Sequence, residues 1–418
     1  MGTMRIAERL LDVPATERRD IVVLGSTGSV GTQAIDIVRR NPERFRVVAL
    51  AAGGGQPEVL ADQAASLGAE AVAVADPAAA GTTARCLSER GSNAKLLTGS
   101  SGVAEVAAWP SEVVLNAITG ALGLESTLAA LRAGRLLALA NKESLIIGGP
   151  LVRQVAEPGQ IVPVDSEHFA LAQCFPRVGF EELASLAQGL VRADMTELRR
   201  LVITASGGPF RGWSRADLAT VTPGQALDHP TWNMGPMITV NSATLVNKGL
   251  EVIEAHLLYD VPFDRIQVMV HPQSVIHSMV EFVDGTTLAQ ASPPDMRLPI
   301  ANGIGWPYRV PDAATSIDWT SAHTWTFEPL DPEAFPAVQL AATVGATGGT
   351  APAVYNAANE EAVTAFLGHR LAFSDIVDTV ARVVSEQRVV TADSGLAGVY
   401  AADEWARARA RELIAGAG

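Results

Sequence analysis

Several residue types and patterns are scarce in this chain of 418 residues, and each scarcity excludes a class of protein. Only two cysteines occur, Cys86 and Cys174, far apart and without CxxC spacing, so neither a disulfide framework nor a zinc site is indicated. Basic residues are outnumbered, 31 against 45 acidic ones, and the formal charge of −14 argues against nucleic-acid or anionic-membrane partners.

Long apolar runs are absent as well. None reaches about 18 residues without a charge, so we expect no membrane span. Residues 1–19 lack the continuous apolar stretch of a secretory signal and are interpreted as a surface extension. A reducing cytoplasmic location fits both this feature and the cysteine usage.

What is present indicates an α/β protein of two or three packed domains, since 48% of the residues are hydrophobic and only 18% charged. From residue 20 to 164, short apolar runs alternate with Ala-rich helical stretches, which predicts a parallel sheet covered by helices on both faces. The expected strands are Ile21–Leu24, Val47–Leu50, Ala71–Val74, Val113–Leu115, Leu136–Leu139 and Ile161–Val164.

The sequence pattern changes beyond Arg200, where strand-like runs surround a long helical segment near Leu245–Leu258. This pattern predicts an α+β domain over residues 165–305, followed by a linker over 306–337 and a helical bundle over 338–418. The expected strands are Leu201–Thr204, Ile266–Val270, Ser278–Val283 and Thr287–Gln290, and the expected helices are Val338–Thr343, Ala351–Leu367, Phe373–Ser385 and Leu396–Ile414.

A glycine-rich turn follows the first expected strand. Gly25, Gly28 and Gly31 give the spacing GxxGxxG, a relative of the dinucleotide fingerprint in which backbone N–H groups at a helix N-terminus face a pyrophosphate. Any tight strand-to-helix turn could use the same glycines, but the position at the first strand of a β/α alternation favours a nucleotide site. We therefore predict a Rossmann-like domain.

The end of the second strand bears on the choice of cofactor. NAD enzymes usually place Asp or Glu there for the ribose hydroxyls, whereas this chain has Gly53, Gly54 and Gly55. Because the loop contains no carboxylate to repel a 2′-phosphate, the sequence favours NADP over NAD. The same loop contains no basic residue that would bind the 2′-phosphate either.

Two polar segments are candidate ligand sites. Asp165 and Glu167 follow the last strand of the first domain, where two carboxylates suit Mg²⁺ or Mn²⁺, although Asp165 could equally be a helix N-cap. Further along, the helix that contains Asn247 and Glu251 would carry Lys248 beside the same face. That face could bind a phosphate and complete a metal site, or it could be a polar surface exposed to water.

A third segment, residues 206–236, resembles a mobile lid. Gly207 and Gly208 would form its hinge, while Trp232 and Met234 would cover a ligand. The competing interpretation is a surface loop with a stray tryptophan.

Eight motifs together resemble the 1-deoxy-D-xylulose-5-phosphate reductoisomerase family. They occur in the family order and are spread over about two-thirds of the chain: GSTGSVG, NAITGALGL, LANKES, PVDSEH, ITASGGPF, HPTWNMG, VNSATLVNKGLEVIEA and HPQSVIHSMVEFVDGT. The resemblance implies NADPH, a divalent metal held by three carboxylates, a sugar phosphate substrate and a homodimer that serves the non-mevalonate route to isoprenoids. Residues 165–305 would then form the catalytic and dimerisation domain.

The resemblance also implies a role for individual residues. Asp165, Glu167 and Glu251 would hold the metal, and the cofactor would contact Thr27, Gly28, Ser29, Val30, Gly53, Asn141, Glu143, Gly235 and Met296. The substrate would contact Lys142, Ser166, Glu167, Ser206, His229, Ser242, Asn247, Lys248 and Glu251. His168, Ser274 and His277 would lie behind these residues or face the cofactor.

Two departures from the family pattern concern the cofactor and an insertion. Gly54 and Gly55 stand where the family often has a basic residue and Asn, so the contacts to the 2′-phosphate stay open. The stretch Gly179–Arg200 looks longer than the family requires, and no role is assigned to it.

The implied reaction rearranges the substrate skeleton to a branched aldehyde on the metal and then reduces it with hydride from NADPH. Lys142 would assist as a cation near the reacting oxygens. Another Rossmann dehydrogenase, such as an aspartate-semialdehyde or homoserine dehydrogenase, would not need three carboxylates for a metal. A non-catalytic NADP-binding regulator could dispense with Lys248 and the DSE triplet.

Overall fold

Seven parallel strands form the first sheet of the computed structural model, which describes residues 17–175, 196–232, 234–387 and 395–416. The strand order β4-β3-β2-β1-β5-β6-β7 reverses direction between β1 and β5, and ligands of such sheets bind at this switch. The strands are β1 (Arg19–Leu24), β2 (Phe45–Ala52), β3 (Ala71–Val74), β4 (Lys95–Thr98), β5 (Val113–Asn116), β6 (Leu136–Leu139) and β7 (Ile161–Pro163).

Burial explains which of these strands the sequence predicts. Every residue of β3, β5 and β6 is buried, so these strands are continuous apolar runs. Strand β4 was not predicted because it is an edge strand with only two apolar residues, both half-buried, between Lys95 and Thr98. Most of the predicted extension 1–19 and of the stretch 179–200 lies outside the described residues.

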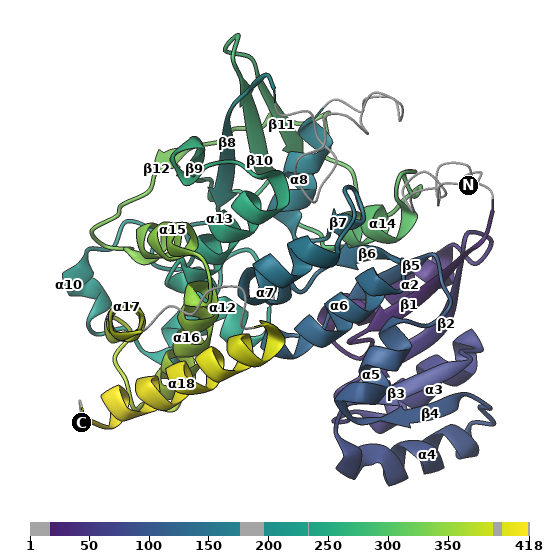
Figure 1. Ribbon diagram of the computed structural model, residues 1–418. Coiled ribbons are helices and arrows are strands. Elements are labelled where there is room, and N and C mark those ends of the chain that lie inside the picture. The colour runs from purple at the N-terminus through teal and green to yellow at the C-terminus, as the bar shows by residue number, and fades with distance from the viewer. Residues whose placement is uncertain (1–16, 176–195, 233, 388–394, 417–418) are drawn as a thin grey trace.

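Helices cover both faces of the first sheet (Figure 1). They are α2 (Ser29–Arg40), α3 (Pro57–Leu67), α4 (Ala80–Glu89), α5 (Gly99–Ala107), α6 (Leu124–Arg132) and α7 (Lys142–Val155), with short 3-10 turns η1 (Pro77–Ala79) and η2 (Gly120–Gly123). Helix α14 (Arg297–Gly305) also packs here, although the sequence places it in the second domain. Its Ile300 and Ile304 are fully buried in the same core cluster as Ile21.

The second sheet has five strands in the order β11-β10-β8-β9-β12. Strands β8 and β9 are parallel and the other neighbours are antiparallel. The strands are β8 (Leu198–Ala205), β9 (Ile266–Val270), β10 (Ile276–Phe282), β11 (Thr287–Ala291) and β12 (Glu328–Pro329). Strand β12 lies in the segment expected to be a linker and pairs with β9.

The longer helices between β7 and β9 along the chain are α8 (Ser166–Cys174), α12 (Pro236–Ala243) and α13 (Val246–Tyr259), and the 3-10 turn η3 (Phe263–Arg265) follows α13. Two shorter ones, α10 (Arg215–Leu218) and α11 (Pro223–Leu227), precede α12. The helix expected near Leu245–Leu258 is α13, which is separate from α12 because Leu245 adopts a left-handed conformation, with φ of 60°.

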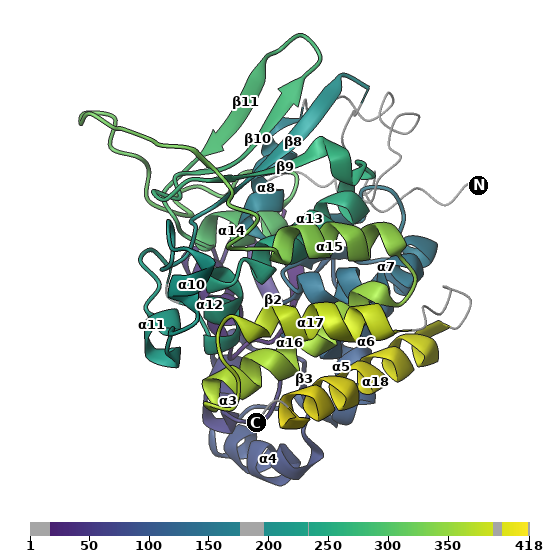
Figure 2. The same ribbon diagram turned by 90° about the vertical axis from the view of Figure 1, so that its left-hand side faces the viewer.

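The C-terminal part is helical, as predicted, with α15 (Ala337–Thr347), α16 (Ala351–Leu367), α17 (Asp375–Glu386) and α18 (Gly395–Gly416). Helix α16 is buried along most of its length, because α15, α17 and α18 contact it together with α7 and α12 (Figure 2). The predicted fold class of Rossmann-like, α+β and helical parts is thereby confirmed. Among the described residues, no helix is both long and apolar enough to cross a membrane.

Candidate active site

The glycine-rich turn after β1 brings the start of α2 to the switch point of the first sheet. Gly25 has φ of 76°, and a Cβ built on Gly31 would overlap the carbonyl oxygen of Gly25. Only glycine permits this approach of helix to strand. Within the described residues no side chain caps α2, and its first turn contains no acidic residue. Its N–H groups are therefore available to a pyrophosphate.

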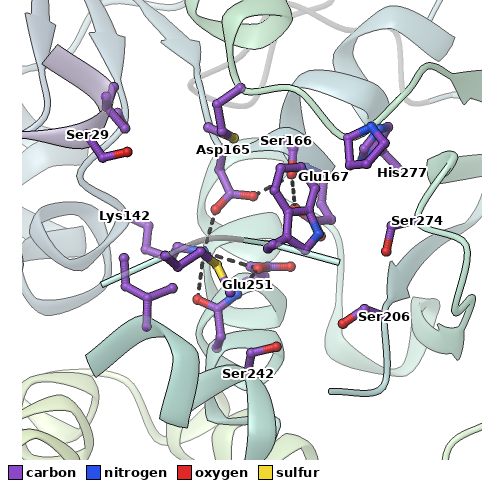
Figure 3. A pocket seen from close by; sticks show the side chains of 18 of the residues that line it. Ser29, Lys142, Asp165, Ser166, Glu167, Ser206, Ser242, Glu251, Ser274 and His277 are labelled. Atoms are coloured by element: carbon purple, nitrogen blue, oxygen red, sulfur yellow. Dashed lines mark hydrogen bonds and ion pairs between the residues drawn. The ribbon is translucent and has the colours of Figure 1, made fainter. Parts of the chain in front are cut away.

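A cavity of about 850 Å³ extends from this turn to the second sheet. Figure 3 shows Ser29 on one side and Ser206, Ser274 and His277 on the other. Five of the predicted cofactor residues line the cavity: Ser29, Val30, Glu143, Gly235 and Met296. The lining does not include Thr27, Gly28, Gly53 or Asn141.

Three carboxylates meet in the cavity, as the resemblance implies. Asp165 follows β7, Glu167 lies in the first turn of α8, and Glu251 lies on α13, yet one oxygen of each lies within 4.8 Å of the others. The alternative role for Asp165 is also real, because its Oδ1 accepts a hydrogen bond of 3.3 Å from the Glu167 N–H at the start of α8. The N-cap therefore orients Asp165 toward the other two carboxylates.

Two buried lysines neutralise these carboxylates in part. Lys142 forms ion pairs with Asp165 and, at 3.1 Å, with Glu251. Lys248 lies 2.9 Å from Glu167 and also pairs with Glu251. Lys248 is 4% exposed and Glu251 is 1% exposed, so the alternative of a polar face open to water is wrong.

The pKa values show how the charges act on one another. Burial raises the pKa of Glu251 to about 7, and the Glu167 carboxylate adds to this, although both lysines lower it. Burial would also raise the pKa of Asp165, but Lys142 and then His168 hold it below its ordinary value. Crowded carboxylates with an excess of negative charge are a suitable donor set for a hard divalent cation. The residues present therefore fit Mg²⁺ or Mn²⁺.

A second, neutral group of donors lies between β8 and α12. His229 Nε2 is 3.1 Å from Ser206 Oγ and 3.1 Å from Ser242 Oγ. Its Nδ1 accepts hydrogen bonds from the N–H groups of Thr231 and Trp232, so the ring proton resides on Nε2. Burial lowers the pKa of His229, which keeps the ring neutral. Two hydroxyls and one imidazole N–H therefore converge as an anion pocket.

The glycines beside Ser206 have conformations that other residues rarely adopt. Gly207 has φ of 85° and Gly208 has φ of 63°. A Cβ on Gly208 would lie 3.1 Å from the Ser242 carbonyl oxygen, so glycine lets the loop approach α12. The two glycines named from the sequence as a hinge therefore have a steric role at this position.

Asn247 and Lys248 do not join the anion pocket in this structure. Asn247 donates a 2.5 Å hydrogen bond to Glu251 and accepts one of 3.1 Å from Lys142. Lys248 likewise faces the carboxylates. Both nevertheless line the same cavity, so their predicted phosphate contact remains a proposal.

The remaining predicted residues surround these two groups. Ser166 donates to Glu167 at 2.7 Å, and Trp232 and Met234 line the cavity. The Trp232 ring lies 6.3 Å from that of His277, measured between centroids. Ser274 and Met296 also line the cavity.

The sequence analysis places His168 behind the site residues but misses its buried partner, Glu254. Glu254 Oε2 lies 3.0 Å from His168 Nε2, and both side chains are fully buried. The hydroxyl of Tyr259 donates to the His168 carbonyl oxygen at 2.7 Å. The available signal was the helical spacing, since Glu254 follows Glu251 by three residues and shares its face.

It also missed how the loop 117–123 is held. Asn116 donates from Nδ2 to the Gly123 carbonyl at 3.1 Å, and its Oδ1 accepts from the Ile118 N–H at 3.2 Å. Asn141 donates to the carbonyls of Ile118 and Gly120. Asn141, which is 1% exposed, therefore shapes the loop, and its side-chain amide is already hydrogen-bonded there.

The glycines after β2 differ in the space around them. Gly54 has φ of 115°, and a Cβ there would lie 2.8 Å from that of Ala79. Gly53 and Gly55 have no atom within 4 Å of such a Cβ. Only these two could carry a side chain toward a ligand without strain.

Comparison with known proteins covers nearly the whole chain. The model of the 1-deoxy-D-xylulose 5-phosphate reductoisomerase family matches residues 21–149, that of its C-terminal domain matches 161–259, and the DXP reductoisomerase C-terminal domain model matches 291–409. A protein of Kitasatospora griseola with the name of this reductoisomerase is 64% identical, over 95% of this chain and 100% of its own. One from Streptomyces avermitilis is 58% identical, over 94% and 97%.

Solved structures agree with these matches. The Zymomonas mobilis reductoisomerase in complex with NADPH is 41% identical, with a TM-score of 0.85, and the match covers 95% of this chain and 99% of that one. A reductoisomerase in complex with NADPH, fosmidomycin and magnesium is 34% identical, with a TM-score of 0.86 and coverage of 95% and 98%. The chain belongs to the 1-deoxy-D-xylulose 5-phosphate reductoisomerase family.

Proposed function

We propose that this chain converts 1-deoxy-D-xylulose 5-phosphate to 2-C-methyl-D-erythritol 4-phosphate, with NADPH and Mg²⁺ or Mn²⁺. One observation carries the proposal beyond family membership. The carboxylates of Asp165, Glu167 and Glu251 lie in the same cavity as Ser29 at the start of α2, so a metal site and a nucleotide site open into one space. Neither a dehydrogenase without a metal nor a non-catalytic regulator would need that arrangement.

Each bound group would supply its own chemistry, the divalent ion as a Lewis acid on the substrate oxygens and NADPH as the hydride donor. Asp165, Glu167 and Glu251 would hold the ion. The N–H groups at the start of α2 would hold the pyrophosphate, beside Ser29 and Val30. Glu143, Gly235 and Met296 line the cavity further along the cofactor site.

Ser206, Ser242 and His229 would bind the substrate phosphate. Their donors converge without carrying a charge, which gives directed hydrogen bonds to phosphate oxygens. Asn247 and Lys248 would join them when the carboxylates turn to the metal, because that turn frees both side chains from Glu251.

Lys142 would act as a fixed cation at the reacting oxygens. Burial tends to lower its pKa, but Asp165 and Glu251 raise it well above the ordinary value. The ammonium therefore stays protonated and stabilises negative charge on substrate oxygens instead of acting as a base.

The segment 206–236 would exclude water as a lid, with Trp232 and Met234 as its apolar surface. Support comes from their place in the cavity lining and from Gly207 and Gly208 at its start, whose positive φ values suit a hinge. We also infer a cytoplasmic homodimer. The edge strand β11, where Leu288 is 45% exposed, offers a surface for a second copy, and sedimentation analysis would test this.

The decisive test combines the purified protein with NADPH, Mg²⁺ and 1-deoxy-D-xylulose 5-phosphate. The nicotinamide absorbance should fall only when all three are present. Oxidation of NADPH without the metal, or with aspartate semialdehyde in place of the sugar phosphate, would overturn the proposal.

A further inference from the structure

Two consecutive polar residues of helix α16, Asn359 and Glu360, lie against two different elements that line the cavity. Asn359 is fully buried, and its Nδ2 donates a 2.9 Å hydrogen bond to Oδ1 of Asn241. Asn241 lines the cavity and precedes Ser242 of the anion pocket. Glu360, the next residue, points instead to the loop 117–123, whose Ile118 and Thr119 line the cavity on the cofactor side.

Glu360 lies beside that loop, at Gly120. A Cβ built on Gly120 would lie 3.2 Å from Glu360 Oε1, and Gly120 has φ of 70°. Asn141 holds the carbonyl of Gly120 from the side of the sheet, with a hydrogen bond of 3.0 Å. The loop is therefore confined between the sheet and α16.

Glu360 is itself fixed by partners on the helical part. Arg407 of α18 donates to its Oε2 at 2.6 Å, and Asn356 donates to its Oε1 at 3.0 Å. Arg407 is in turn bound by Asp403, at 2.6 Å, on its own helix. Charge-assisted hydrogen bonds of this kind hold a carboxylate in one orientation.

Helix α16 also packs against α7, which begins at Lys142, and against α12. Three elements of the site therefore rest on one buried helix: the cofactor loop, the lysine helix and the helix of the anion pocket. Nothing in the proposed reaction requires Asn359 or Glu360 to touch a ligand, and neither lines the cavity.

We propose that Glu360 and Asn359 are positioning residues that set the two halves of the site separately, Glu360 through the cofactor loop and Asn359 through α12. The proposal rests on the proposed function for the identity of the ligands. It assigns to the C-terminal helices a direct part in the geometry of the site. Glu360 variants should affect cofactor binding, and Asn359 variants should affect sugar phosphate binding.

The first test compares Glu360→Gln with Glu361→Gln. Both residues are about equally exposed, at 23% and 21%, and both pair with Arg407, but Glu360 lies beside Gly120 of the loop, whereas Glu361 also pairs with Arg411 at 3.2 Å. Calorimetry should give a roughly three- to tenfold weaker Kd for NADPH in Glu360→Gln, which is less than the loss of a direct charge-assisted contact because Glu360 acts through the loop. The KM for the sugar phosphate should stay constant. Equal NADPH affinities in the two variants would overturn the role of Glu360.

The second test uses Asn359→Ala, with Asn359→Ser as a milder variant because the site is fully buried. The KM for the sugar phosphate should rise several-fold while the Kd for NADPH is unchanged. A purely structural role predicts a lower Tm with both ligands affected alike, and that result would overturn the assignment. NADPH binding needs no turnover, so the Glu360 result stands even if wild-type protein fails to convert the sugar phosphate, which would instead defeat the proposed function.

Discussion

The carboxylate cluster and the anion pocket line one cavity but are held together by different kinds of interaction. The cluster of Asp165, Glu167, Glu251, Lys142 and Lys248 is a buried set of charges, in which every partner depends on the others. The pocket of Ser206, His229 and Ser242 is neutral and depends on directed hydrogen bonds. Removal of a carboxylate from the cluster should therefore reduce activity far more than removal of a hydroxyl from the pocket, because an unpaired buried charge is costly.

Replacing Glu251 by Gln should have the largest effect. The amide keeps the size but removes one charge from the donor set, so metal affinity should fall and kcat should drop roughly a thousandfold, as loss of several kcal/mol of charge stabilisation requires. Isothermal titration with Mn²⁺ and steady-state assays would measure both. Excess metal should restore part of the activity.

Asp165→Asn and Glu167→Gln provide the matched variants. Each removes one carboxylate from the same cluster and leaves the others in place. Wild-type metal affinity in all three folded variants would contradict the metal site.

The second largest effect is expected for Lys248→Ala, which sharpens the comparison. In this structure Lys248 pairs with Glu167 and Glu251. In the proposed function these carboxylates bind the metal, and Lys248 is then free to bind the phosphate. Loss of a charge-assisted phosphate contact should raise KM roughly tenfold or more. Metal affinity should not weaken, because a competing cation has been removed. An unchanged KM with tighter metal binding would confine Lys248 to the cluster.

How much of this site the sequence could reveal depends on the range of the interaction. The DSE triplet and the glycine turn are local, so their place at strand ends follows from the apolar runs before them. The pairing of His168 with Glu254 joins α8 to α13, and no local pattern determines it. The return of α14 to the first sheet is likewise a matter of packing, decided by buried residues such as Ile300.

A third prediction extends the comparison to the 2′-phosphate end of the cofactor, where the loop has no charge. Gly55→Asp would place a carboxylate in open space after β2, whereas Gly54→Asp would be confounded by strain. NADPH should lose roughly tenfold in kcat/KM relative to NADH, since a like charge would face the phosphate. Gly55→Asn is the neutral control. The same preference in both variants would mean that the phosphate lies elsewhere.

A smaller effect is expected in the neutral pocket. Ser206→Ala removes one uncharged hydrogen bond to the phosphate, so KM should rise about three- to tenfold with kcat almost unchanged. The rise should persist at high salt, since neutral contacts are not screened as charge pairs are. A hundredfold rise in KM would contradict the contrast between the neutral pocket and the charged cluster, because it would show that the pocket acts through charge.

The smallest effect is a pH dependence that comes from Glu143, whose carboxyl group ionises near neutral pH. Burial raises the pKa of Glu143 from 4.5 to about 7, although Lys142 lowers it, while Glu360 and Glu254 contribute to the rise. Between pH 4.5 and 7 the folded state therefore binds more protons at Glu143 than the unfolded state, so its contribution to the free energy of unfolding declines as pH rises through this window.

NADPH affinity should follow the same direction, because Glu143 lines the cavity and its ionised form repels phosphate charge. Calorimetry at pH 6 and pH 8 should show a roughly two- to fivefold weaker Kd at the higher pH, the range for partly exposed charges. Glu143→Gln should flatten this dependence and leave the fold intact, since the amide is neutral at both values. If the Kd of the variant and that of the wild type change equally with pH, a group other than Glu143 controls the pH dependence of NADPH binding.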